Sequence, residues 1–129
     1  MRLVRIGPAG SEVAGALLDD ETFIDLSDVV GDFTEAFFAS GALATLATVV
    51  GERVAAGRAE PVGGRRFGAP IARPHQILCI GLNYSDHAAE TGQAVPAEPI
   101  LFTKSPNTLI GPNDDVVIAR AQLIGGTAL

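Results

Sequence analysis

A histidine and a carboxylate, the residue types best suited to proton transfer, lie three positions apart at His87 and Glu90. They belong to the stretch ILCIGLNYSDHAAETG, which also carries Asn83, Tyr84 and Asp86. Residues i and i+3 of a helix share one face, so Glu90 could hold one tautomer of the imidazole and raise its basicity. The pair could then take a proton from water as a general base.

The same two side chains also have a plainer interpretation. A histidine and a glutamate on an exposed helix often do no more than keep a surface soluble, and structural ion pairs are common. Their position just beyond an apolar run favours a site, because functional side chains are often carried on loops held by a rigid scaffold. The pair alone does not decide between the two interpretations.

The elements around this pair are expected to be strands with one short helix. QILCIG predicts a buried strand with a sharp exit at Gly81, and PILFTK predicts a second strand. Asn83 or Ser85 can cap a short helix through DHAAE, which Gly92 ends. SPNTLIGPNDDVVI predicts a loop, a turn and a third strand, so this unit is expected to be rich in β-structure.

The N-terminal residues predict a separate small unit. Three short apolar runs within residues 1–30, separated by polar turns, predict an antiparallel meander. Asp32 is expected to be the N-cap of a helix through FTEAFFAS, with Glu35 completing a capping box. ALATLATVVGERVAAG predicts a second helix that ends at Gly57.

Residues 58–74 are rich in glycine, proline and arginine, which predicts a solvated linker. His75 directly follows this segment and is expected at the surface. The chain is therefore expected to consist of a small domain at 1–57, the linker, and a second domain at 75–129. The predicted class is α+β, mainly β, with a meander-and-helix domain first.

Composition limits the class of protein. The chain has 129 residues, of which 47 % are hydrophobic, enough for a core. Its 15 acidic and 9 basic residues give a net charge of −6, which disfavours nucleic acid and anionic membranes as partners. Cys79, the single cysteine, lies in an apolar run where an inert thiol is expected. Without an internal disulfide, a signal peptide or an apolar run long enough to span a bilayer, a cytoplasmic protein is expected.

The segments CIGLNYSDHAAETG, PAEPILFTKSPNTLIGPND and VVI, in that order, resemble the fumarylacetoacetate hydrolase family. APIARPHQILCIG resembles the entry to that family's catalytic domain, and residues 1–70 look like the small N-terminal domain of many bacterial members. The likeness runs from Met1 to about Ile118. It implies that the second unit is the start of a mixed β-roll, usually dimeric.

The resemblance also implies a chemistry. Members cleave C–C bonds of β-diketo acids, decarboxylate oxaloacetate-like acids, or isomerise and hydrate dienoates, and they bind Mg²⁺, Mn²⁺ or Ca²⁺. His87 and Glu90 match the family motif NYxDHxxE, in which they activate water or shuttle a proton. Lys104 matches the lysine of an F-x-K stretch, with a structural role as the alternative. The implied partners are a small keto acid and a second copy of the chain.

The metal ligands that the resemblance implies are a Glu-x-Glu pair and a later aspartate. The sequence has no Glu-x-Glu and no acidic residue after Asp115. Asp114 and Asp115 lie in GPNDD, whose composition is typical of a turn, so neither is assigned to a metal. We therefore expect the ligands to lie beyond Leu129, in a longer enzyme, and no ion to bind these residues alone. The alternative is a non-catalytic chain that keeps a small interaction domain.

Overall fold

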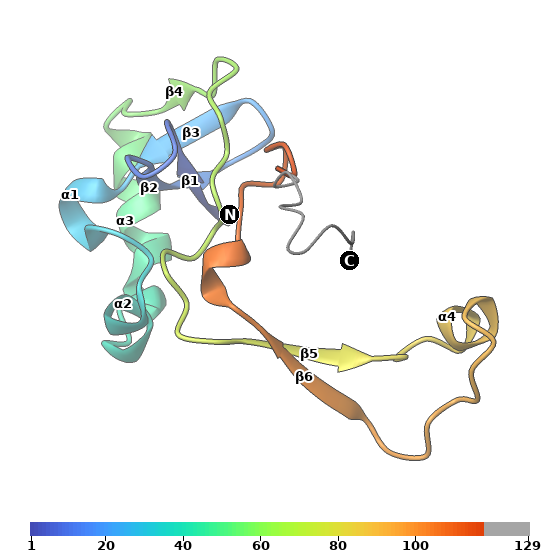
Figure 1. Cartoon of the computed structure of the whole chain (residues 1–129). Coiled ribbons are helices and arrows are strands. Elements are labelled where there is room, and N and C mark those ends of the chain that lie inside the picture. The colour runs from blue at the N-terminus through green and yellow to red at the C-terminus, as the bar shows by residue number, and fades with distance from the viewer. Residues whose placement is uncertain (118–129) are drawn as a thin grey trace, which may run out of the picture.

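The structure is a computed structural model that describes residues 1–117 (Figure 1). One antiparallel sheet has four strands in the order β1 (Arg2–Ile6), β2 (Val13–Leu17), β3 (Thr22–Asp25) and β4 (Glu60–Pro61). A second antiparallel sheet has two strands, β5 (Ile77–Gly81) and β6 (Ile100–Lys104). The helices are α1 (Ser27–Val30), α2 (Glu35–Ala39), α3 (Leu43–Ala55), α4 (Ser85–Glu90) and the 3₁₀ helix η1 (Pro106–Thr108). None of these helices has the length and apolar character needed to cross a bilayer.

The combination of helices with antiparallel sheets confirms the expected α+β class. Helices and strands hold similar numbers of residues within 1–117, so the expected excess of β-structure is not found in this part of the chain. The mixed β-roll stays a prediction for the second unit.

The predicted N-terminal meander is confirmed, since β1, β2 and β3 pair in sequence order. The turn between β2 and β3 is held by Asp19, whose carboxylate accepts the backbone N–H groups of Glu21 and Thr22 at 2.8 and 2.7 Å. A Cβ atom at Gly15 would lie 2.2 Å from the ring of Phe23. Any side chain at this position would therefore clash with the Phe23 ring.

Successive side chains of a strand point to opposite faces of the sheet. Both faces of this sheet are buried. One face carries Ala16 and Ile24 and packs against α2 and α3. The other face carries Leu17 and Phe23 and packs against Val62, which lies just after β4. The larger cluster, on the helical side, consists of Ala14, Ala16, Ile24, Leu26, Phe33, Phe37, Leu46 and Val50.

Both helices predicted from the N-terminal sequence are present, but the expected cap of the first is wrong. Helix α3 is followed, as predicted, by Gly57 at a positive φ of 69°. The N-cap of α2 is Thr34, whose side-chain oxygen accepts the Phe37 N–H at 3.3 Å. Asp32 instead binds the guanidinium of Arg5 through two hydrogen bonds of 2.7 and 2.9 Å. A bidentate, charge-assisted contact of this kind is stronger than a cap.

We expect Thr34→Ala to lower the free energy of unfolding by about 1 kcal/mol, the usual cost of losing an N-cap oxygen. Thr34→Ser keeps that oxygen and should retain most of the stability. Urea unfolding followed by far-ultraviolet circular dichroism measures both variants. Equal losses from alanine and serine would contradict the assignment of Thr34 as the cap.

The segment expected to be a solvated linker, residues 58–74, instead packs on the N-terminal sheet for much of its length. Strand β4 pairs with β3, and Val62 is buried. Phe67 forms an isolated β-bridge with Ile6, and the Ala72 N–H donates to the Phe33 carbonyl at 2.9 Å. Composition alone misleads here because Arg66 pairs with two carboxylates distant in sequence, Glu12 and Asp114. The boundaries at 57 and 74 stay a prediction.

Strands β5 and β6 form a hairpin that extends away from the N-terminal sheet, with α4 at its far end (Figure 1). The run predicted as a buried strand is only half covered, because Leu78 is 61 % exposed, and Leu101, which pairs with Ile80 on the same face of the hairpin, is 63 % exposed. No second sheet or helix among residues 1–117 covers this face. Of the predicted third strand, Val116 and Val117 lie outside any strand, and Ile118 lies outside the described residues.

Candidate functional site

Helix α4 carries the candidate pair, and a tight turn after β5 positions it. Leu82, between the two elements, has a φ of 48°. A side chain in this left-handed region stores about 1–3 kcal/mol of strain, and such strain concentrates at functional sites. The N-cap is Tyr84 and makes no side-chain capping bond, so the expected caps Asn83 and Ser85 are wrong.

The end of α4 lies where the sequence predicts it. Gly92 has a φ of 66°, and its N–H donates to the Ala89 carbonyl at 3.1 Å. The hydroxyl of Thr91 donates to the carbonyl of His87 at 2.9 Å and closes the last turn. The backbone carbonyl of His87 is therefore held at the C-terminal end of a helix of six residues.

His87 and Glu90 lie on this one helix, as predicted, and both side chains are exposed. Within residues 1–117 neither side chain has a hydrogen bond or an ion pair, so the contact in which Glu90 orients the imidazole is not formed. Ala88, between them, is the buried residue of α4. The helix thus presents the pair to a ligand or to a covering segment, and the roles of both side chains stay a prediction.

An open cleft of about 270 Å³ lies beside the turn that precedes α4. Leu82 and Asn83 line one side, and the segment that leads into β6 lines the other with Pro96 and Glu98. Glu98 is the one charged residue of this lining. No local pattern points to Glu98, because only the fold of the connection between α4 and β6 brings it into the same cleft as Asn83.

The structure does not bring Lys104 to the candidate pair. In the hairpin Lys104 is opposite Ile77, at the start of β5, whereas α4 follows Gly81 at its other end. Four residues of strand separate these ends by about 13 Å. The role of Lys104, catalytic or structural, stays a prediction.

The other candidates have ordinary surroundings. His75 is exposed, as predicted, and its Nε2 lies 3.1 Å from a carboxylate oxygen of Glu35. Cys79 is a half-buried free thiol opposite Phe102. Asp114 closes a turn, as its composition predicts, by accepting the Gly111 N–H at 2.7 Å.

The described residues 1–117 do not form a group of side chains suited to a divalent metal ion. Among residues 1–117 no three His, Cys, Asp or Glu side chains form a group that could hold one. Residues 118–129, IARAQLIGGTAL, contain none of these types. A hard cation such as Mg²⁺ needs several oxygen ligands. That these residues alone bind no ion stays a prediction, and no step below is assigned to a metal.

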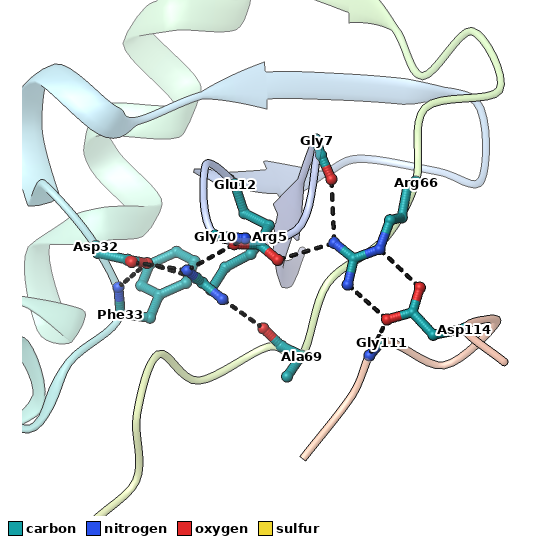
Figure 2. A network of polar contacts seen from close by, with 10 residues as sticks. All are labelled: Arg5, Gly7, Gly10, Glu12, Asp32, Phe33, Arg66, Ala69, Gly111 and Asp114. Carbon is teal, nitrogen blue, oxygen red and sulfur yellow. Dashed lines mark hydrogen bonds and ion pairs between the residues drawn. The ribbon is translucent and has the colours of Figure 1, made fainter. Parts of the chain in front are cut away.

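A network of charged side chains that the sequence did not predict lies at the base of the hairpin (Figure 2). Arg66 donates to both carboxylate oxygens of Asp114 and to Glu12, the latter at 2.8 Å. Arg5 donates to Asp32 and, at 3.3 Å, to the second oxygen of Glu12. Only 7 % of the Glu12 side chain is exposed. The only signals in the sequence are the Arg-Arg pair in the presumed linker and a lone glutamate between apolar runs.

This network favours the charged form of three of its members, Glu12, Arg66 and Asp114. Hydrogen bonds from Arg66 and from the Gly111 N–H hold the pKa of Asp114 below its usual value. Burial opposes ionisation of Glu12, but the bonds from Arg66 and its neighbours outweigh this effect and lower its pKa. The two carboxylates together raise the pKa of Arg66. All three groups are therefore held in their charged forms at neutral pH.

Comparison with protein families gives one match, over residues 76–124, to the family model described as "Fumarylacetoacetate (FAA) hydrolase C-terminal". This range contains β5, α4 and β6, and with them both members of the candidate pair. The matched segment is therefore the one that the sequence singles out for chemistry.

Curated relatives match along nearly the whole chain. A protein of Burkholderia ambifaria strain MC40-6, whose name gives no more than the class hydrolase, is 38 % identical over 95 % of this chain and 42 % of its own length. A protein of Sphingomonas sp. strain SKA58 named 2,4-didehydro-3-deoxy-L-rhamnonate hydrolase is 39 % identical over 97 % of this chain and 41 % of its own. The chain thus spans about two fifths of the length of these relatives.

Proposed function

Since the chain belongs to the fumarylacetoacetate hydrolase family through residues 76–124, we propose that the protein carrying it hydrolyses a carbon–carbon bond of a small β-diketo acid. The observation that carries this proposal is the His87–Glu90 pair, presented on an exposed helix that follows a strained turn within the matched segment. No other pair of described residues combines an unpartnered histidine with a carboxylate on one helical face.

The proposed reaction needs a base that can reach a water molecule. His87 takes a proton from water, and the resulting hydroxide adds to the carbonyl carbon distant from the acid group. The bond between that carbon and the central methylene then breaks. One product leaves as a carboxylic acid, and the methylene carbanion takes the proton back to give an α-keto acid.

Glu90 is proposed to act through His87 and not on the substrate. A single rotamer change of either exposed side chain would bring the carboxylate to the imidazole, because residues i and i+3 of a helix are neighbours. The carboxylate would then stabilise the imidazolium that forms when His87 takes the proton. A second copy of the chain is proposed as the partner in the assembled enzyme.

The substrate class is supported by the name of one relative, a 2,4-didehydro-3-deoxy-L-rhamnonate hydrolase. We propose that this chain shares its preference for an acid with oxidised carbons 2 and 4. The described lining of the cleft beside Asn83 has no basic side chain and one acidic side chain, Glu98, so the acid end of the substrate is proposed to bind outside this lining.

The test is an assay of the protein that carries this sequence with acetylpyruvate, the smallest common β-diketo acid. Hydrolysis adds one water and yields acetate and pyruvate in equal amounts, which chromatography measures. Oxaloacetate is the matched second substrate, since its decarboxylation yields pyruvate and carbon dioxide. Equal acetate and pyruvate support the proposal. Turnover of oxaloacetate alone would replace it with a decarboxylase, and turnover of neither would favour the non-catalytic interpretation.

A further inference from the structure

We propose that Glu12, Arg66 and Asp114 form a latch that fixes the base of the β5–β6 hairpin on the N-terminal sheet. We name these three residues the Arg66 latch. The proposal concerns how α4 is held relative to the N-terminal unit, and it stands whether or not the proposed hydrolysis is correct.

The Arg66 latch joins three segments that are far apart in the sequence (Figure 2). Arg66 lies 54 positions from Glu12 and 48 positions from Asp114. Its guanidinium makes a bidentate contact with Asp114, a bond of 2.8 Å with Glu12, and a bond of 3.1 Å with the Gly7 carbonyl. Bidentate contacts of this kind fix orientation as well as distance.

Close backbone packing accompanies the ion pairs. A Cβ atom at Gly111 would lie 2.2 Å from the Phe67 carbonyl oxygen and 3.2 Å from a guanidinium nitrogen of Arg66. Gly111 is buried although it lies in a surface turn. The turn at residues 111–114 therefore sits directly on the chain at residues 66–67, in a position that only glycine permits.

The latch acts on the hairpin because both ends of the hairpin are attached near it. On the side of β5, the Gly68 N–H donates to the Arg5 carbonyl at 2.8 Å and the Ala72 N–H donates to Phe33. On the side of β6, only η1 separates Lys104 from the turn that holds Asp114. The first attachment consists of backbone hydrogen bonds to β1 and to Phe33, whereas the second depends on the Arg66 latch.

Glu12 makes the attachment rigid by linking the two arginines. Its nearly buried carboxylate accepts from Arg66 with one oxygen and from Arg5 with the other, and Arg5 is held by Asp32. A side chain with several fixed partners cannot reorient freely, so Arg66 is held in place before Asp114 binds. Preorganisation of this kind lowers the entropic cost of the last contact.

The test uses the 129-residue chain and nuclear magnetic resonance, with amide hydrogen exchange of Gly111 and the nuclear Overhauser contact between Gly111 and Phe67 as readouts. Asp114→Asn removes the charge but keeps the size of the side chain. It should speed exchange at Gly111 by about 10- to 100-fold, the range for a lost charge-assisted bond, and weaken the Gly111–Phe67 contact. Amides of β2 serve as the internal reference and should not change.

Two further variants make the outcome decisive. Asp115→Asn is the matched control, since the adjacent Asp115 is exposed, and it should leave both readouts at their original values. Gly111→Ala keeps every charge and should open the turn by steric clash with Phe67. The proposal is overturned if Asp114→Asn and Asp115→Asn have equal effects, or if Gly111→Ala leaves the contact with Phe67 intact. Because the readouts are structural, neither outcome depends on catalysis.

Discussion

His87→Ala is expected to lower kcat for acetylpyruvate hydrolysis by roughly 10²–10⁴ in the protein that carries this sequence, the usual loss when a general base is removed. The imidazole is exposed on α4 and has no partner among the described residues, so it is free to take a proton from water. KM should change little, because His87 is proposed to act on water and not to bind the keto acid. Steady-state kinetics with both substrates separate these two effects.

The chain supplies its own control for this experiment. His75, the second histidine, is exposed and paired with Glu35, so His75→Ala should leave kcat within a factor of two of its original value. Glu90→Gln should lower kcat in the same direction as His87→Ala but by less, because an amide still orients the ring without stabilising its charge. Near-normal kcat in His87→Ala would exclude the proposed base.

Local patterns in the sequence predict the N-terminal elements well. Each strand of the meander is a short apolar run between turn residues, and each pairs with its neighbour along the chain. Helix α3 has an apolar stripe and the terminal Gly57. These elements follow from residues that are close in sequence, which is the information that periodicity and turn chemistry contain.

The errors share one physical cause, which is that a distant partner overrides a local preference. Asp32 has the chemistry of a cap, but Arg5 lies within reach only after β1 is placed in the sheet. Arg66 reads as part of a solvated linker until Glu12 and Asp114 converge on it. No local pattern contains such contacts, because they form only between segments that the fold brings together.

The candidate site also has some features that local patterns predict and others that they do not. The helix that carries His87 and Glu90, and its end at Gly92, follow from spacing and a glycine signal. The strained turn at Leu82 and the placement of Glu98 across the cleft do not, since both depend on how the connection between β5 and β6 folds back. Likewise, the distance of Lys104 from α4 follows only from the register of the hairpin.

The second large effect is expected in the core, where Phe33→Ala should lower the free energy of unfolding by about 3–5 kcal/mol. Phe33 is fully buried, and its ring meets that of Phe37 edge to face at 5.2 Å between centroids. Truncation removes this contact and leaves a cavity beneath α2 and α3. A small domain has only about 5–15 kcal/mol of stability in total, so much of the margin would be lost.

Phe38→Ala is the matched control, because Phe38 lies in the same stretch and also contacts Phe37, at 5.0 Å, yet is 39 % exposed. Phe38→Ala should lower the free energy of unfolding by no more than about 1.5 kcal/mol, the upper range for an aromatic pair without full burial. The chain has no tryptophan, and its single tyrosine, Tyr84, is 72 % exposed near α4. Urea unfolding must therefore be followed by far-ultraviolet circular dichroism, since fluorescence does not report on this core. Similar losses in both variants would mean that Phe33 does not hold the helices on the sheet, and that the larger cluster is centred elsewhere.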